Sequence, residues 1–258
     1  MTHAKVWFVG AGPGAADLLT LRAAAAISAA DIVVWAASLV HEDVLTHARE
    51  DAEIVDSAPL TLEQIGEVYE RARERGLRVA RVHSGDPTLY SAVGEQIRLL
   101  DELGIPYEIV PGVSSVAGAA AALGRELTVP ERAQSLIVSR REGRSPMPAG
   151  ERLTELAAHG ATMALLLSIG RPVELQADLL EGGYAPDTPC AVVYRASWPD
   201  ELVLRCPLGE LADRVAEAGI ERQAIVLVGP GLEDDSSTRS HLYDPAHGHR
   251  FRPAGTAS

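Results

Sequence analysis

Short apolar runs alternate with amphipathic stretches along the whole chain. The runs are VWFV, DIVVW, RVARV, YEIV, SLIVS, ATMALLLS, CAVVY and AIVLV, and the stretches between them repeat their apolar positions with the period of a helix. Alternation of buried strands with amphipathic helices is typical of proteins with largely parallel sheets. The pattern therefore predicts an α/β fold.

The clearest predicted helix lies in PLTLEQIGEVYERARERG. Thr61 and Gln64 have the spacing of a capping box, and Gly76 is placed to end the helix. One face carries the apolar positions Leu62, Ile65, Val68, Tyr69 and Ala72.

The alternation stops and restarts around VPGVSSVAGAAAALGRELTVPE, where an alanine-rich helix runs into a proline-containing connector. We therefore expect two α/β domains, residues 1–115 and 116–232. Periodicity is lost after Gly231, so we expect residues 233–258 to form a polar, partly disordered tail. Its histidines, His241, His247 and His249, are expected to belong to this tail rather than to a metal site.

The acidic balance of the 258 residues limits the possible partners. There are 23 Lys and Arg against 36 Asp and Glu, a formal net charge of −13. This charge disfavours nucleic acid and anionic lipid as partners. Because no run approaches the roughly 20 apolar residues of a spanning helix and the start shows no signal-peptide pattern, we expect a soluble, cytoplasmic protein.

The two cysteines, Cys190 and Cys206, have no C-x-x-C spacing and no histidine at zinc-finger spacing. Neither a disulfide framework nor a structural metal site is indicated. Each is expected to be a small buried residue of a strand.

A glycine-rich turn follows the first apolar run. Residues 10–15, GAGPGA, match the G-x-G-x-x-A pattern of dinucleotide-binding proteins. However, Thr20 is the expected N-cap of the next helix, which would begin too late for its N–H groups to reach a pyrophosphate. Pro13 lacks a donor, and Asp31 precedes the second strand instead of following it. The NAD(P)-dependent dehydrogenase interpretation is therefore disfavoured.

Two further loops end predicted strands. Residues 84–87, SGDP, follow RVARVH, and residues 111–115, PGVSS, follow YEIV. Ligands collect at the strand-end loops of open parallel sheets. We expect the three loops to form one pocket.

In this order and at these distances, GAGPG, HSGDPTLY and VPGVSS resemble the loops of the tetrapyrrole methylases. This two-domain family transfers a methyl group from S-adenosylmethionine during corrinoid and siroheme synthesis. The resemblance runs from about Val6 to Gly229, and VVWAASLV, DSAPLTLEQI, ELTVPE, HGATMALLLS and DTPCAVVYRASWPDE are similar to its corrinoid branch. The family's first loop usually reads GAGPGD, whereas this chain has Ala15 and so no carboxylate at that position.

The resemblance implies a tetrapyrrole methylase fold, with a mixed second sheet and a ligand cleft between the domains. It implies S-adenosylmethionine as methyl donor, S-adenosylhomocysteine as product and no metal. The implied acceptor is carbon C11 of the precorrin-4 macrocycle, either metal-free or as its cobalt complex, with another tetrapyrrole position as a further alternative. A homodimer is implied as well.

Carried over residue by residue, the resemblance implies cofactor contacts at Pro13, Ser84, Gly85, Asp86, Leu89, Ser114, Ser115, Ile169 and Ala196. The group from Ser84 to Asp86 would line the methionine end, and Ile169 and Ala196 would cover the adenosine. Glycines permit close approach of the main chain. Asp86 is the best placed carboxylate, but a G-D-P turn commonly uses Asp to bond its own backbone. We therefore assign no general base.

A precorrin carries many carboxylates, so an acidic protein needs local cations to bind it. Arginine suits this task because its planar fork bonds a carboxylate at two points. SRREGRSP supplies Arg140, Arg141 and Arg144, and Arg195 lies at a predicted strand end. For the SRREGRSP cluster, a solvated loop is the alternative.

Three other functions compete. A methyltransferase of the same fold acting on ribosomal RNA or a protein side chain is disfavoured by the acidic balance and the corrinoid-like strings. A serine hydrolase needs G-x-S-x-G, and Gly112 to Val116, GVSSV, lacks the closing glycine. A non-catalytic ligand-binding protein stays open, because a sequence indicates a pocket and not turnover.

Overall fold

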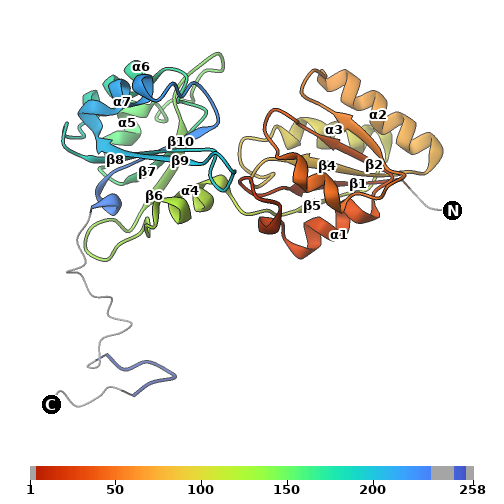
Figure 1. Ribbon diagram of the computed structural model, residues 1–258, viewed down its shortest axis with the longest axis horizontal. Helices are drawn as coiled ribbons and strands as arrows, with labels where there is room; N and C mark the ends of the chain where they lie inside the picture. Colours follow the sequence, from red (N-terminus) through yellow and green to blue (C-terminus); the bar gives the residue numbers. More distant parts are fainter. Residues whose placement is uncertain (1–3, 234–246, 254–258) are drawn as a thin grey trace. The chain divides into compact units, whose positions relative to one another are not determined.

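The computed structural model describes residues 4–233 and 247–253 (Figure 1). Its contacts divide the chain into two compact units. The first runs to Ala122 and also includes Arg195–Leu202, and the second comprises Leu123–Tyr194 and the chain from Val203 onward. The predicted domain limits at residues 115 and 232 stay a prediction. Most of the predicted tail, His241 included, lies outside the described residues.

The first unit is built on a five-stranded sheet with the order β3-β2-β4-β1-β5. The strands are β1 (Lys5–Gly10), β2 (Ile32–Trp35), β3 (Glu53–Asp56), β4 (Arg78–His83) and β5 (Tyr107–Val110). All four pairings are parallel. The carboxyl ends of β4, β1 and β5 therefore lie side by side at one edge of the sheet.

Helices cover both faces of this sheet, with α1 on the opposite side from α2 and α3 (Figure 1). The helices are α1 (Leu21–Ala29), α2 (Leu62–Arg75) and α3 (Val93–Leu103), and α4 (Ser115–Leu123) follows β5. Along β1, Phe8 packs in the α2–α3 cluster, whereas Val9 packs in the α1 cluster. Because successive residues of β1 are buried on opposite faces, this strand carries adjacent apolar residues, as is usual in parallel sheets.

Helix α2 begins and ends where the sequence predicts. The Thr61 hydroxyl accepts the Gln64 N–H at 3.4 Å, and the Gln64 side chain accepts the Thr61 N–H at 2.9 Å. Gly76 follows the helix with φ of +66°, a conformation that glycine adopts without strain. The predicted capping box and helix end are confirmed.

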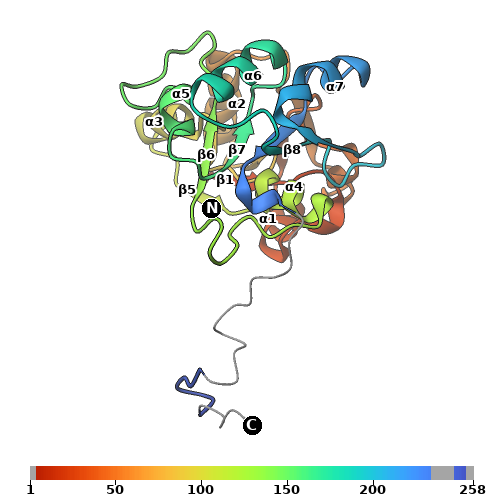
Figure 2. The same cartoon turned by 90° about the vertical axis from the view of Figure 1, so that its left-hand side faces the viewer.

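The second unit contains a mixed sheet with the order β6-β7-β10-β8-β9. Its elements are β6 (Leu136–Arg140), α5 (Leu153–Ala157), β7 (Thr162–Leu166), α6 (Pro172–Glu181), β8 (Pro189–Tyr194), β9 (Leu202–Pro207), α7 (Leu211–Glu217) and β10 (Ala224–Val228). Strands β6 and β7 are parallel, and β10 is antiparallel to β7 and β8. Figures 1 and 2 show α5, α6 and α7 on one side of these strands. The predicted α/β class, with a mixed second sheet, is confirmed.

No helix within residues 4–233 and 247–253 combines the length and apolar character needed to cross a membrane.

Asp31 lies at the start of β2, at the amino edge of the first sheet. One carboxylate oxygen accepts the Arg78 N–H at 2.8 Å, and the other accepts Arg49 Nη1 at 2.7 Å. Hydrogen bonds, first from the Arg78 side chain, lower the pKa of Asp31 to about 2 despite partial burial. Asp31 therefore joins the starts of β2 and β4, and it lies at the edge opposite to the glycine turn after β1.

Replacing Asp31 with asparagine is expected to lower the free energy of unfolding at neutral pH by roughly 2 kcal/mol. A carboxylate whose pKa is lower in the folded state stabilises the fold above its unfolded pKa of about 3.9, and that contribution is lost as pH falls toward 2. The difference between D31N and the parent should therefore shrink between about pH 4 and 2 in urea unfolding. Asp101→Asn, at an exposed position of α3, is the control; a D31N difference that does not change with pH contradicts the prediction.

Candidate functional site

The three glycine-containing loops meet at the carboxyl edge of the first sheet. The turn after β1 and the loop after β4 are joined by two backbone hydrogen bonds, from the Gly85 N–H to the Gly12 carbonyl at 2.8 Å and from the Gly12 N–H to the Gly85 carbonyl at 3.2 Å. The Ala11 N–H adds a third, to the His83 carbonyl at 2.8 Å. These bonds hold the turn after β1 and the loop after β4 against each other. That the three loops form one pocket stays a prediction.

Glycines allow these main chains to approach each other. A Cβ on Gly112 would lie 2.3 Å from the Gly85 carbonyl oxygen, and a Cβ on Gly10 would lie 2.5 Å from the Gly112 nitrogen. Real Cβ atoms essentially never come within 3.0 Å of such a neighbour. The sequence predicts these glycines for close approach to a ligand, and the structure adds a different reason: the loops need them to pack on one another.

Asp86 links the loop after β4 to the loop after β5. One of its carboxylate oxygens accepts the Thr88 N–H at 2.8 Å and the Thr88 hydroxyl, and the other accepts the Gly112 N–H at 2.9 Å. Burial raises the pKa of Asp86, but these hydrogen bonds outweigh it and hold the pKa below its usual range. Asp86 therefore bonds its own loop, as the G-D-P turn predicts, and both oxygens are engaged.

The charge in the three loops is negative. Residues 10–15, 84–90 and 111–115 contain Asp86 and no Lys or Arg. His83, which ends β4, is buried, and burial is the main cause that lowers its pKa to about 3, so the imidazole is neutral at physiological pH. A site of this charge suits a cationic ligand better than a pyrophosphate.

The segment 195–202 packs against the glycine turn within the first unit. Trp198 Nε1 donates to the Pro13 carbonyl at 3.0 Å, and a Cβ on Gly14 would lie 2.2 Å from Trp198 Cδ1. The Ser197 hydroxyl accepts the Ala15 N–H at 2.9 Å. Pro13 also packs on α4: a Cβ on Gly118 would lie 2.7 Å from the Pro13 ring. Pro13 is therefore buried between Trp198 and α4.

Strained residues shape this segment. Arg195 and Ser197 have φ of +47° and +65°, values that non-glycine residues keep only where the surroundings impose them. Arg195 pairs with Asp200 at 2.6 Å and stacks on Trp198, with 4.8 Å between the guanidinium carbon and the ring centroid. The ring of His41 meets Trp198 edge-on, with centroids 4.9 Å apart. The string RASWPDE carries part of the family resemblance, but the sequence does not reveal this role of Trp198, because its partner Pro13 is 185 positions away.

Eight of the nine predicted cofactor contacts belong to the first unit. They are Pro13, Ser84, Gly85, Asp86, Leu89, Ser114, Ser115 and Ala196. Leu89 is 38% exposed, so its side chain is available as an apolar wall. Ile169 is buried in the second unit, after β7. Their contacts with a cofactor stay predictions.

The candidate arginines differ in their contacts. Arg141 Nε donates to Asp178 at 2.5 Å, and Arg195 is paired with Asp200, so a ligand carboxylate would compete with these partners. Arg140 donates to main-chain carbonyls, among them that of Ser145 at 3.2 Å. Arg144 is exposed. The arginines that bind substrate stay a prediction.

The tail histidines that the structure describes lie in a short turn, in which His249 and Arg252 form an isolated bridge. Within the described ranges 4–233 and 247–253, no three His, Cys, Asp or Glu residues are grouped as metal ligands.

The chain is similar to known methyltransferases over most of its length. A family model described as Tetrapyrrole (Corrin/Porphyrin) Methylases matches residues 5–212. A precorrin-4 C(11)-methyltransferase from Sinorhizobium sp is 49% identical over 251 residues, which are 97% of this chain and 99% of the relative. The solved structure of a cobalt-precorrin-4 methyltransferase is 41% identical, with a TM-score of 0.86 over 89% of this chain and 96% of that one.

A uroporphyrin-III C-methyltransferase from Thermus thermophilus, solved in complex with S-adenosylhomocysteine, is 31% identical, with a TM-score of 0.74 over 87% of this chain and 97% of that one. The family match covers four of the five strands of the second unit as well as the whole sheet of the first. Together with the shared fold, it gives the family: the chain belongs to the tetrapyrrole (corrin/porphyrin) methylases.

Proposed function

We propose that this protein transfers a methyl group from S-adenosylmethionine to C11 of precorrin-4 and so forms precorrin-5 during synthesis of the corrin ring of cobalamin. The observation that carries the proposal is the 49% identity to a precorrin-4 C(11)-methyltransferase over 97% of the chain. A cobalt-precorrin-4 substrate is the second candidate, because the solved relative with a TM-score of 0.86 is a cobalt-precorrin-4 methyltransferase.

The loops of the first unit suit the methyl donor. S-adenosylmethionine supplies an electrophilic methyl group on a sulfonium cation and carries no phosphate. The loops offer the hydroxyls of Ser84 and Ser114, main-chain groups and the negative charge of Asp86, without a basic residue. We assign Ser84 to Asp86 to the methionine end and Ala196 and Ile169 to the adenosine. Pro13, Leu89 and Ser115 complete the proposed contacts.

The residues of this chain are proposed to act by positioning. The acceptor is an electron-rich carbon, so alignment of the reactants and exclusion of water supply most of the rate, an effect of about 7–11 kcal/mol in favourable cases. His83 is buried, and both oxygens of Asp86 are hydrogen-bonded to Thr88 and Gly112. We therefore assign no general base.

Three further parts of the proposal rest on the sequence pattern and, for the homodimer, on the family resemblance. Arg140, Arg141, Arg144 and Arg195 are the proposed partners of the substrate carboxylates. The enzyme is proposed to be a cytoplasmic homodimer, and light scattering of the purified protein tests the dimer. We propose domains 1–115 and 116–232.

Incubation with precorrin-4, or with its cobalt complex, and S-adenosylmethionine carrying a 13C-labelled methyl group tests the reaction. We expect NMR of the product to place the label on C11. Label on another ring carbon would change the assigned site of methylation. Binding of the methyl donor without turnover of either acceptor would indicate a ligand-binding protein that has no methyltransferase activity. Calorimetry should detect S-adenosylmethionine and not NAD(P); the opposite result overturns the proposal.

A further inference from the structure

The two cysteines of the chain face each other across neighbouring strands of the second sheet. Cys190 lies in β8 and Cys206 in β9, which are adjacent in the sheet. The Leu208 N–H donates to the Thr188 carbonyl at 2.9 Å, so the residue before β8 is opposite the residue after β9. This contact sets an antiparallel register. Two residues after Thr188 in β8 is Cys190, and two residues before Leu208 in β9 is Cys206, so the two cysteines are opposite each other.

The spacing of such a pair suits a disulfide. Hydrogen-bonded positions recur every second residue of an antiparallel pair, so Cys190 and Cys206 occupy the same type of position as Thr188 and Leu208. The Cα atoms of such opposed residues are about 5.5 Å apart. Disulfides span Cα distances of about 4.4–6.8 Å, so the Cα spacing of this pair lies within the range of a disulfide.

The two sulfur atoms already interact. The Cys190 thiol donates a hydrogen bond to the Cys206 sulfur, which raises the pKa of Cys190, with burial adding to the effect. The same hydrogen bond lowers the pKa of Cys206. Cys206 is therefore the thiol that ionises first, and Cys190 remains protonated beside it.

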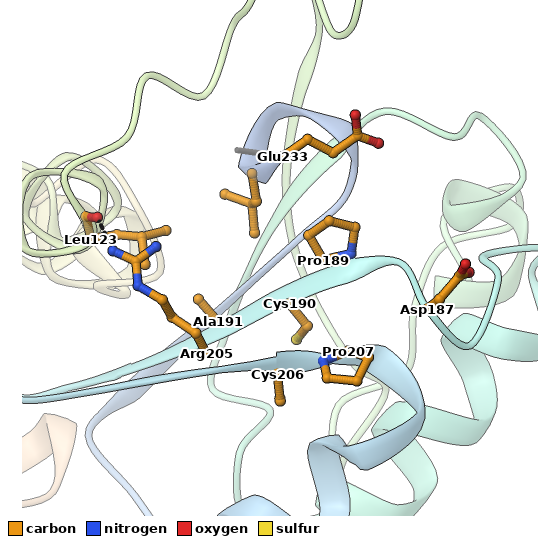
Figure 3. A pocket seen from close by; sticks show the side chains of 10 residues that line it. Leu123, Asp187, Pro189, Cys190, Ala191, Arg205, Cys206, Pro207 and Glu233 are labelled. Atoms are coloured by element: carbon orange, nitrogen blue, oxygen red, sulfur yellow. Dashed lines mark hydrogen bonds between the residues drawn. The ribbon is translucent and has the colours of Figure 1, made fainter. Parts of the chain in front are cut away.

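A cavity of about 430 Å³ gives small molecules a route to the pair. Both cysteines are among its lining residues, and Figure 3 shows them on adjacent strands at its wall, with Arg205 nearby. Cys206 is 9% exposed and Cys190 is 3% exposed, so Cys206 is also the more accessible thiol.

We propose that Cys190 and Cys206 form a modification site that low-molecular-weight disulfides oxidise to a disulfide between β8 and β9. The Cys206 thiolate attacks one sulfur of the small disulfide, forms a mixed disulfide and releases one small thiolate, which takes the Cys190 proton. The Cys190 thiolate then attacks the Cys206 sulfur, forms the protein disulfide and releases the second small thiolate, which takes up from water the proton that Cys206 lost on ionising. Two protein thiols are oxidised, and one small disulfide is reduced to two thiols.

Treatment of the folded full-length protein with oxidised glutathione tests this site. After an acid quench, we expect the intact mass to fall by two hydrogen atoms and an unreduced peptide map to link Cys190 to Cys206. Dithiothreitol should restore both thiols to iodoacetamide labelling. The proposal is overturned if both thiols of the folded protein stay free while the urea-unfolded chain is oxidised, or if glutathione remains attached to the parent protein.

Two single variants separate the roles of the thiols. Cys190→Ser should keep glutathione on Cys206 as a lasting adduct, because the resolving thiol is missing. Cys206→Ser should leave Cys190 unmodified under the same conditions; an equal adduct on both variants contradicts the assigned order. Circular dichroism checks that each variant is folded, and the parent experiment decides the proposal if one is not.

Discussion

Replacement of Gly112 with alanine is expected to lower the free energy of unfolding by about 3 kcal/mol and to abolish detectable binding of S-adenosylmethionine. The added Cβ would lie 2.3 Å from the Gly85 carbonyl oxygen and 2.8 Å from the Gly10 carbonyl carbon. Both neighbours are main-chain atoms at strand ends, so no flexible side chain can move aside. Urea unfolding measures the stability, and calorimetry measures the binding.

Gly94→Ala is the matched control for this variant. Gly94 lies in the first turn of α3, where an added Cβ meets nothing within 4 Å. Alanine is the better helix former, so this change should leave stability unchanged or raise it by up to about 1 kcal/mol. Gly112→Ala with the stability and affinity of Gly94→Ala would show that the loops do not depend on this contact.

Replacement of Trp198 with alanine is expected to lower the free energy of unfolding by roughly 2 to 3 kcal/mol and the affinity for S-adenosylmethionine about tenfold. The variant loses the ring that covers Gly14 and the hydrogen bond to the Pro13 carbonyl. Without them, the turn is less well held in the conformation that the proposed site requires.

Trp198→Phe separates the two contributions. It keeps an aromatic ring over Gly14 and removes the N–H that Pro13 accepts, so we expect a loss of about 1 kcal/mol in stability. Urea unfolding and calorimetry on both variants give the comparison. If Trp198→Ala binds the methyl donor as tightly as the parent protein, segment 195–202 does not position the turn.

The features that the sequence predicted correctly depend on neighbours in the chain. The Thr20 hydroxyl accepts the Ala23 N–H at 3.1 Å, and the Thr61 and Gln64 pair caps α2. Each interaction spans three residues, so the residue types at that spacing determine it. The α/β class follows in the same way from local pattern: continuous apolar runs indicate strands that are buried on both faces, and helical periodicity indicates helices that are buried on one face.

The features that sequence reasoning missed join distant parts of the chain. Trp198 and Pro13 are 185 positions apart, and the contact of Gly112 with Gly85 depends on the register of separate strands. Asp31 shows the same limit: its position ahead of β2 was predictable, but its bonds to Arg49 and Arg78 were not. The pattern of apolar and polar residues in one segment does not show which distant segment packs on it.

Because residues 195–202 belong to the first unit, that unit is not complete when its own sheet has been synthesised. A nascent chain of 122 residues contains all five strands of the first sheet, yet the Pro13 carbonyl lacks its indole donor and Gly14 lacks its cover. During translation, more than seventy residues after Ala122 must be synthesised before Trp198 is available to pack on the turn after β1. The order of synthesis therefore makes the glycine turn, the first loop to be made, dependent for its final packing on a segment that is made much later.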